Sequence, residues 1–178
     1  MKKLLCIILA IVLAVSFTAC GKETPEKAAD NALKAIKNFN LVGIAKYFGD
    51  DYLDDFDIDD ISADGMKVLK KLVSKMSWEI LGSVVDGDSA VVTVKLTSVD
   101  LSPIITEVSA ELLGDAFSSL LGDKMSEEEM EQKALEIVEQ ELSKKDVAMT
   151  TNNIDLKLTR NENSWKVEFD LWSMISER

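Results

Sequence analysis

Two separate stretches of the chain alternate apolar and polar residues, and this alternation limits the fold more than any other feature of the sequence. The first covers residues 78–96 with a tight turn at Asp86-Gly87, and the second covers residues 154–171 with a turn at residues 161–163. A period of two places successive side chains on opposite faces of a strand, so each stretch predicts a β-hairpin and the pair predicts one antiparallel sheet. The residues expected to face inward are Val92, Val94, Leu156, Leu158, Trp165, Val167 and Phe169.

Five other segments carry apolar residues at helical spacing. They cover residues 24–39, 41–48, 66–76, 102–122 and 126–145. The last two form an insertion, residues 102–145, whose first helix is expected to direct Ile105, Val108 and Leu112 inward. This order of elements predicts an α+β fold, in which N-terminal helices pack on an antiparallel sheet made of two hairpins, with a two-helix insertion between the hairpins.

The amino-terminal residues are typical of a secretion signal. Lys2 and Lys3 precede an apolar run from Leu4 to Val15, which is shorter than the about 20 apolar residues that a membrane-spanning helix needs. After the small residues that follow, Cys20-Gly21 resembles the end of the lipobox of bacterial lipoproteins, in which the cysteine becomes the first mature residue and carries diacylglycerol. The alternative is an ordinary signal peptide followed by an incidental cysteine.

This interpretation divides the chain into three parts. They are a lipoprotein signal peptide at residues 1–19, a lipidated Cys20 with a short tether at residues 20–23, and a single domain at residues 24–178. We therefore expect the domain to lie outside the cytoplasm, anchored by its lipid to the outer face of the cell membrane. Cys6 would leave with the signal peptide and Cys20 would be lipidated, so no free thiol and no disulfide would remain.

Charge and the absence of histidine exclude several classes of function. The chain carries 32 Asp and Glu against 20 Lys and Arg, a formal net charge of −12, and such a surface repels nucleic acid. It contains no histidine, which removes the usual general base, the commonest metal ligand and a Ser-His-Asp triad. We expect no cofactor, no nucleic-acid partner and no enzymatic activity.

Three pieces of the chain resemble the small lipoproteins of Gram-positive bacteria that are domains of unknown function with a cystatin-like or nuclear-transport-factor-2-like fold. These pieces are Thr24-Pro25-Glu26-Lys27-Ala28-Ala29 through Tyr47-Phe48, Trp78-Glu79-Ile80-Leu81-Gly82 through Val99-Asp100-Leu101, and Ser164-Trp165-Lys166-Val167. The resemblance implies a curved sheet wrapped around helices, often with a cone-shaped cavity. It implies no activity. Some relatives with this shape isomerise steroids with an aspartate base and a tyrosine donor, for which Asp100 and Tyr47 are the candidates here. A helix cap at Asp100 and a core position for Tyr47 are the simpler interpretation.

An acidic run between Gly49 and Gly65 holds eight aspartates, and this density raises the question of a calcium loop. Twelve-residue loops that start at Asp55 or Asp60 place Met66 or Lys71 where a bidentate glutamate belongs, so neither start fits. A simpler interpretation is that Ser62 or Asp64 caps the following helix. A weak divalent-cation site is left as an alternative, with Asp55, Asp57, Asp59, Asp60 and Asp64 as its ligands.

Taken together, these features predict a lipid-anchored, non-catalytic domain that binds a small ligand, a peptide or another protein of the cell envelope. The rivals are the cavity enzyme described above and a structural component of the envelope. Trp78, Trp165 and Trp172 are candidates for ligand stacking, and Trp172 is expected to face outward because it follows an inward position at Leu171.

Overall fold

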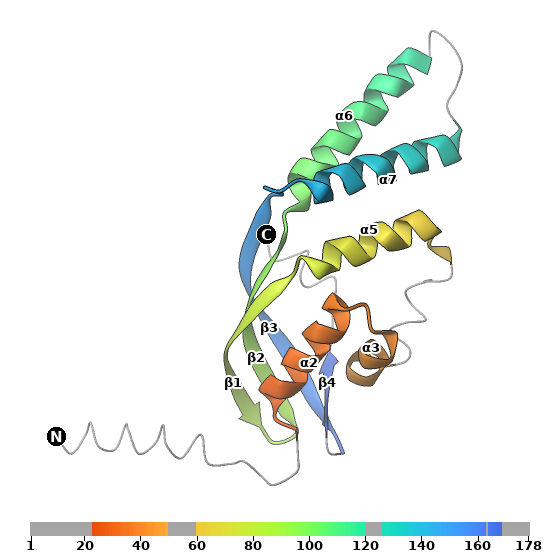
Figure 1. Cartoon of the computed structure of the whole chain (residues 1–178). Coiled ribbons are helices and arrows are strands. Elements are labelled where there is room, and N and C mark those ends of the chain that lie inside the picture. The colour runs from red at the N-terminus through yellow and green to blue at the C-terminus, as the bar shows by residue number, and fades with distance from the viewer. Residues whose placement is uncertain (1–22, 50–59, 120–125, 163, 169–178) are drawn as a thin grey trace, which may run out of the picture.

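The computed structural model describes residues 23–49, 60–119, 126–162 and 164–168. Its centre is one curved antiparallel sheet with strand order β1-β2-β3-β4 (Figure 1). The strands are β1 (Ser77–Asp86), β2 (Ser89–Val99), β3 (Met149–Asn161) and β4 (Ser164–Glu168). Both predicted hairpins are therefore confirmed, and so is the antiparallel sheet that they form. Gly87 allows the first turn, because its φ of 58° is disfavoured for residues with a Cβ.

Three helices lie on one face of the sheet, as the helices-first order predicted (Figure 1). They are α2 (Pro25–Lys37), α3 (Leu41–Phe48) and α5 (Ala63–Ser74). Each begins where a polar side chain caps the first turn, and the capping residues are Thr24, Asn40 and Ser62. Two further helices, α6 (Leu101–Ser119) and α7 (Glu127–Ser143), stand between β2 and β3, so the α+β fold class with its two-helix insertion is confirmed.

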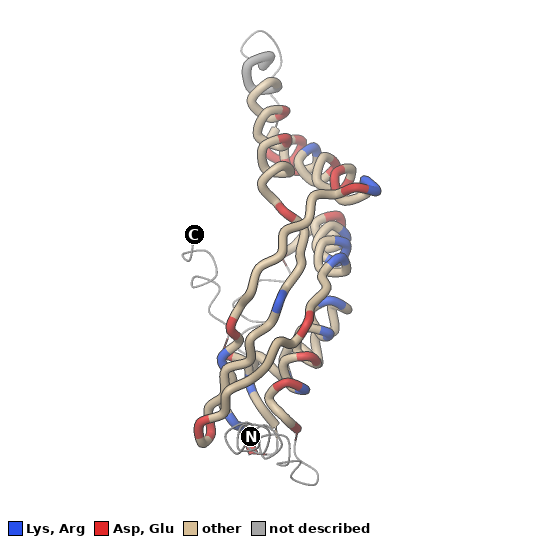
Figure 2. Tube along the Cα trace, turned by 90° about the vertical axis from the view of Figure 1, so that its left-hand side faces the viewer, with Lys and Arg blue, Asp and Glu red and all other residues tan. Residues whose placement is uncertain are grey.

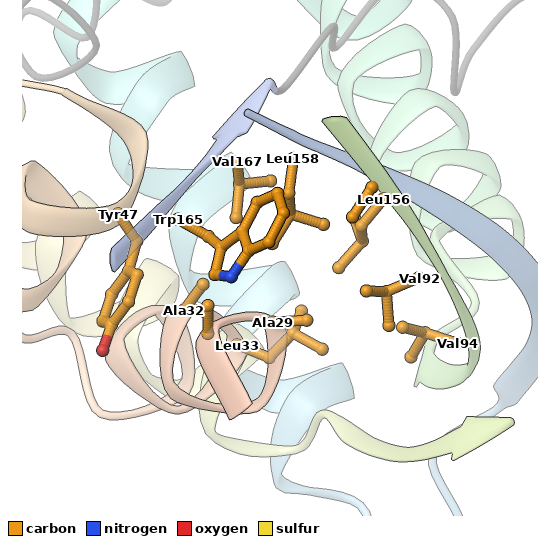
Figure 3. Close-up of a cluster of buried hydrophobic side chains, with 12 residues drawn as sticks. Ala29, Ala32, Leu33, Tyr47, Val92, Val94, Leu156, Leu158, Trp165 and Val167 are labelled. Atoms are coloured by element: carbon orange, nitrogen blue, oxygen red, sulfur yellow. The ribbon is translucent and has the colours of Figure 1, made fainter. Parts of the chain in front are cut away.

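The main core lies between α2, α3 and the inner face of the sheet (Figure 3). Small side chains such as Ala28, Ala29 and Ala32 let α2 approach the strands closely, while the Trp165 ring fills the space beside them. Six of the residues predicted to face inward are buried: Val92, Val94, Leu156, Leu158, Trp165 and Val167. The seventh, Phe169, lies outside the described residues.

The edge strand β1 contains an irregularity that the alternation did not predict. Its register against β2 shifts between Ile80 and Gly82, so Leu81 is an extra residue in a β-bulge and is 48% exposed. Beyond the bulge, Val84 pairs with Val91 on the outer face of the sheet and is 72% exposed. A bulge on an edge strand hinders pairing with other chains.

The insertion is fixed at its base by the two central strands. Val99 pairs with Met149, and the Asp100 N–H donates to the Ala148 carbonyl at 2.9 Å, so α6 leaves the sheet where α7 returns to it. A second, smaller core of Val99, Ile104 and Leu142 holds the helices there. The prediction that Ile105 faces inward is wrong, because Ile104 takes the buried position and Ile105 is 61% exposed.

Candidate functional site

The helical insertion carries four large apolar side chains that are exposed: Leu101, Ile105 and Leu113 on α6 and Met130 on α7. We call these four residues the insertion surface. The two helices meet at their base and diverge toward their far ends (Figure 1). Burial follows this geometry: Leu142 at the base of α7 is fully buried, whereas Met130 near its start is 36% exposed. Leu113 on α6 is 70% exposed. The two helices therefore leave apolar side chains in contact with water at a distance from the sheet.

The charged residues of the two insertion helices are mostly acidic. Helix α7 contains seven glutamates and one lysine, and α6 contains three acidic residues and no cation. Figure 2 shows these acidic positions along both helices. The single lysine of α7, Lys133, pairs with Glu111 of α6 at 3.5 Å and so links the two helices. The predicted capping box at the start of α7 is present, with Ser126 and Glu129 bonded reciprocally. The insertion therefore carries exposed apolar side chains on two helices whose charged residues are mostly acidic.

One basic helix already packs against α7 within the fold. Helix α5 carries three lysines in twelve residues, and its Val68 and Leu72 pack on the second core beside Leu142. Lys71 Nζ lies 2.5 Å from Ser143 Oγ and 3.7 Å from Glu139 Oε1, both on α7. The contact thus combines apolar packing with pairing between an α5 lysine and an α7 carboxylate.

A second polar cluster lies at the opposite end of the sheet, around Glu23. Its Oε1 accepts hydrogen bonds from Asn31 Nδ2 and from Tyr47 Oη, each at 2.8 Å, and its Oε2 accepts one from Ser164 Oγ at 2.6 Å. The Glu23 backbone carbonyl accepts a further bond from Trp165 Nε1 at 3.0 Å. Glu23 therefore joins α2, α3 and β4 at the first residue that the structure describes.

These contacts also determine the ionisation of Glu23. Partial burial alone would raise the pKa of its carboxyl group, but hydrogen bonds from Ser164, Tyr47 and Asn31 and the nearby Lys46 ammonium together hold the pKa below its ordinary value. The carboxylate is thus charged at neutral pH with its oxygens engaged by the protein. This arrangement is suited to holding the chain in place.

Asp100 and Tyr47, the candidates for an isomerase, do not come together. Asp100 Oδ1 accepts a hydrogen bond from the Ser102 N–H at 3.0 Å, so it caps the start of α6. Tyr47 is buried in the main core, and its hydroxyl donates to Glu23, which also bonds to Ser164 beside the turn between β3 and β4. Asp100 follows Val99, which pairs with Met149 at the other end of β3, so at about 3.4 Å per residue the two are about 30 Å or more apart.

The structure describes only part of the acidic run. Asp55, Asp57 and Asp59 lie outside the described residues. Asp60 is exposed, and Asp64 pairs with Lys67 at 2.7 Å within α5. Ser62 is the N-cap, since its hydroxyl accepts from the Gly65 N–H at 3.2 Å. Among the described residues, no three carboxylates or thiols gather in a way that would hold a metal ion.

Of the predicted lipidation site and the three tryptophans, the structure describes only Trp78 and Trp165. Cys20 and Trp172 lie outside the described residues. Trp165 is 1% exposed and is a core residue. Trp78 is half-buried, donates to Asp30 Oδ1 at 3.2 Å and lies under Lys37. Both described tryptophans are thus engaged by the fold and are poor candidates for stacking on a ligand.

Sequence reasoning missed both Glu23 and the exposure of Leu113. Glu23 bonds to Ser164, which is 141 residues away, and no local pattern points to such a contact. The exposure on the insertion could have been detected in the sequence, because α6 carries apolar residues on more of its circumference than one neighbouring helix can cover.

Comparison with known proteins gives a family and one solved structure. The model of a family described as "Domain of unknown function (DUF5105)" matches residues 24–176. A crystal structure of a putative lipoprotein (ycdA) from Bacillus subtilis subsp. subtilis strain 168 is similar, with 15% identity and a TM-score of 0.45. The match covers 93% of this chain but 52% of that one. No curated protein matches the chain. In the part of the chain that the structure describes, no helix is long and apolar enough to cross a membrane.

Proposed function

The chain belongs to the DUF5105 family, a domain of unknown function, and we propose that it is a lipid-anchored, extracytoplasmic, non-catalytic domain that binds another component of the cell envelope through its helical insertion. The observation that carries this proposal is the exposure of Ile105 and Leu113 on a helix that projects from the sheet. Apolar area of this kind marks a contact surface when it gathers on one element.

Two points support binding rather than catalysis. The chain has no histidine, and the Asp100 and Tyr47 pair that the isomerase alternative requires is divided between opposite ends of the sheet. The relationship to cystatin-like and nuclear-transport-factor-2-like domains stays a prediction, as do the small-ligand and structural alternatives.

The anchor is proposed on the sequence of the leader and of Cys20-Gly21. The structure adds one supporting feature, since Glu23 is fastened to the sheet only three positions after Cys20. Three extended residues reach about 10 Å, so a lipid on Cys20 would keep this end of the domain close to the bilayer. The insertion lies at the other end of the sheet, away from that surface (Figure 1).

Replacing Cys20 by alanine should leave the precursor without lipid and largely uncleaved at this site, because the modified thiol is lost. Mass spectrometry of the amino terminus from membrane and medium fractions measures the result. A wild-type protein found in the medium with an unmodified amino terminus would contradict the anchor.

Partner binding can be tested in the cells that make the protein. A photoreactive residue at position 113 should give a cross-linked product of defined mass, because this site is 70% exposed on the insertion surface. Position 84 is the matched control, since Val84 is an equally exposed valine on the outer face of the sheet. The same products from both positions, or none from position 113, would count against the proposed function.

A further inference from the structure

The edge of the sheet at β3 is only partly paired in the part of the chain that the structure describes. Strand β3 has 13 residues, whereas β4 has 5 and pairs with the stretch from Lys157 to Asn161 (Figure 1). The Arg160 N–H donates to the Asp88 carbonyl on the β2 side, so the N–H groups at odd positions of β3 point to the opposite side. Those of residues 151, 153 and 155 therefore meet no described strand. A row of open backbone groups of this kind accepts another strand.

Burial on the inner face of β3 decreases along the same stretch. Leu158 is 1% exposed and Leu156 is 6% exposed, but Ile154 is half-buried and Asn152 is exposed. Ile154 lies at the border of the main core. A strand added at this edge would bury it further if apolar side chains occurred at alternate positions of that strand.

The chain runs directly from β4 toward this open edge. Glu168 pairs with Lys157, and each further residue of an uninterrupted strand would lie one position back along β3. Residues 169–176 would then lie opposite residues 149–156 in reverse order. In this register Leu171 would lie beside Ile154, and the inner face would receive Phe169, Leu171, Ser173 and Ile175.

We propose that residues 169–176 dock on the open edge of β3 as a strap that reaches the base of the helical insertion. The family model matches as far as residue 176, so this segment belongs to the domain. Because the segment starts at the end of β4, its local concentration at the edge exceeds that of a strand from another molecule. The strap ends opposite Met149, which pairs with Val99 where the insertion leaves the sheet. It therefore closes the edge of the sheet and fixes the place from which α6 and α7 project.

The register brings one pair of like charges together. Asp170 would lie opposite Asp155 on the outer face, where directly opposed like charges are destabilising. Asp155 accepts a hydrogen bond from Thr93 Oγ1 at 2.7 Å, and Lys157 would lie diagonally to Asp170. Because Asp155 and Lys157 are exposed, salt screens the repulsion, and the apolar side chains of the inner face outweigh it.

Cysteine pairs in the full-length protein test the register. In the variant N152C and S173C the two substituted positions would be directly opposite on the inner face, with Cβ atoms about 4.5 to 5.5 Å apart, so mild oxidation should link them. The matched control is N153C and S173C, which moves one thiol to the outer face and should form little of this disulfide. Peptide mapping by mass spectrometry identifies each linked pair and distinguishes it from Cys6 and Cys20. Equal yields from the two variants, or no link in the first, would overturn the inference.

Hydrogen exchange gives a second test that introduces no thiol. In the wild type, the N–H groups of residues 151, 153 and 155 should exchange slowly, because the strap accepts their hydrogen bonds. Leu171→Asp should speed their exchange, since it places a charge on the inner face, whereas Trp172→Asp on the outer face should change it little. Fast exchange in the wild type, no effect of Leu171→Asp, or the same effect of both variants would contradict the strap. Neither test depends on the lipid or on a partner, so such a result leaves the proposed function standing.

Discussion

Replacing Trp165 by alanine is expected to lower the free energy of unfolding by about 3 to 5 kcal/mol, the range for a large aromatic residue removed from a packed core. Trp165 lies on β4, is 1% exposed and packs in the same core as the α2 alanines, so the substitution leaves a cavity that α2 must collapse to fill (Figure 3). It also removes the bond from Nε1 to the Glu23 carbonyl and the stacking of Arg160, whose guanidinium carbon lies 4.3 Å from the ring centre.

Chemical denaturation followed by circular dichroism measures this loss. Trp78→Ala is the matched control, because Trp78 is half-buried at the edge of the same core and should cost clearly less. A loss below about 1 kcal/mol for Trp165→Ala would show that the residue packs less tightly than its burial indicates.

The strands could be predicted from the sequence because only one face of the sheet is buried, so apolar and polar residues alternate along each strand. Val92 and Val94 on β2, and Trp165 and Val167 on β4, follow that period without interruption. The helices were similarly visible, because their N-caps are marked by Ser62 and Ser126. Local patterns of this kind need no knowledge of which elements are neighbours.

Features that depend on neighbours could not be predicted. Periodicity gives the apolar side of α6, but it does not say that α7 covers Ile104 and leaves Ile105 in water. The bulge at Leu81 is equally hidden, since it arises from the pairing of β1 with β2 and leaves the composition of the strand unchanged. The candidate surface is partly in this second group: the sequence shows that α6 has more apolar residues than one neighbouring helix can cover, but it does not show which of them, such as Leu113, stay exposed.

The contacts of Glu23 also join distant parts of the chain and could not be predicted from local patterns. For Glu23 we predict the second large loss of stability. Replacing it by alanine should cost about 2 to 3 kcal/mol, because Tyr47, Asn31 and Ser164 lose a charged acceptor in a half-buried site. Glu23→Gln keeps the size of the side chain and a carbonyl acceptor, so its loss should be smaller. Urea unfolding of both variants at neutral pH measures the two costs. Equal stability of Glu23→Ala and the wild type would show that water replaces the carboxylate without penalty.

The pH dependence of the unfolding free energy distinguishes the contribution of the negative charge of Glu23 from that of its packing. Its pKa in the folded protein lies below the ordinary value of 4.5, so the unfolded chain takes up the proton first as the pH falls. The stabilisation is therefore complete above that ordinary value and is lost as the pH falls through the folded pKa. Glu26 and Asp30 also have lowered pKa values and will destabilise the wild type in acid, but they do so equally in Glu23→Gln. The difference in unfolding free energy between wild type and Glu23→Gln should thus be largest near neutral pH and shrink below about 4.5. A difference that stays constant down to acid pH would mean that Glu23 holds this end of the chain by shape alone, and that its negative charge contributes nothing to the fold.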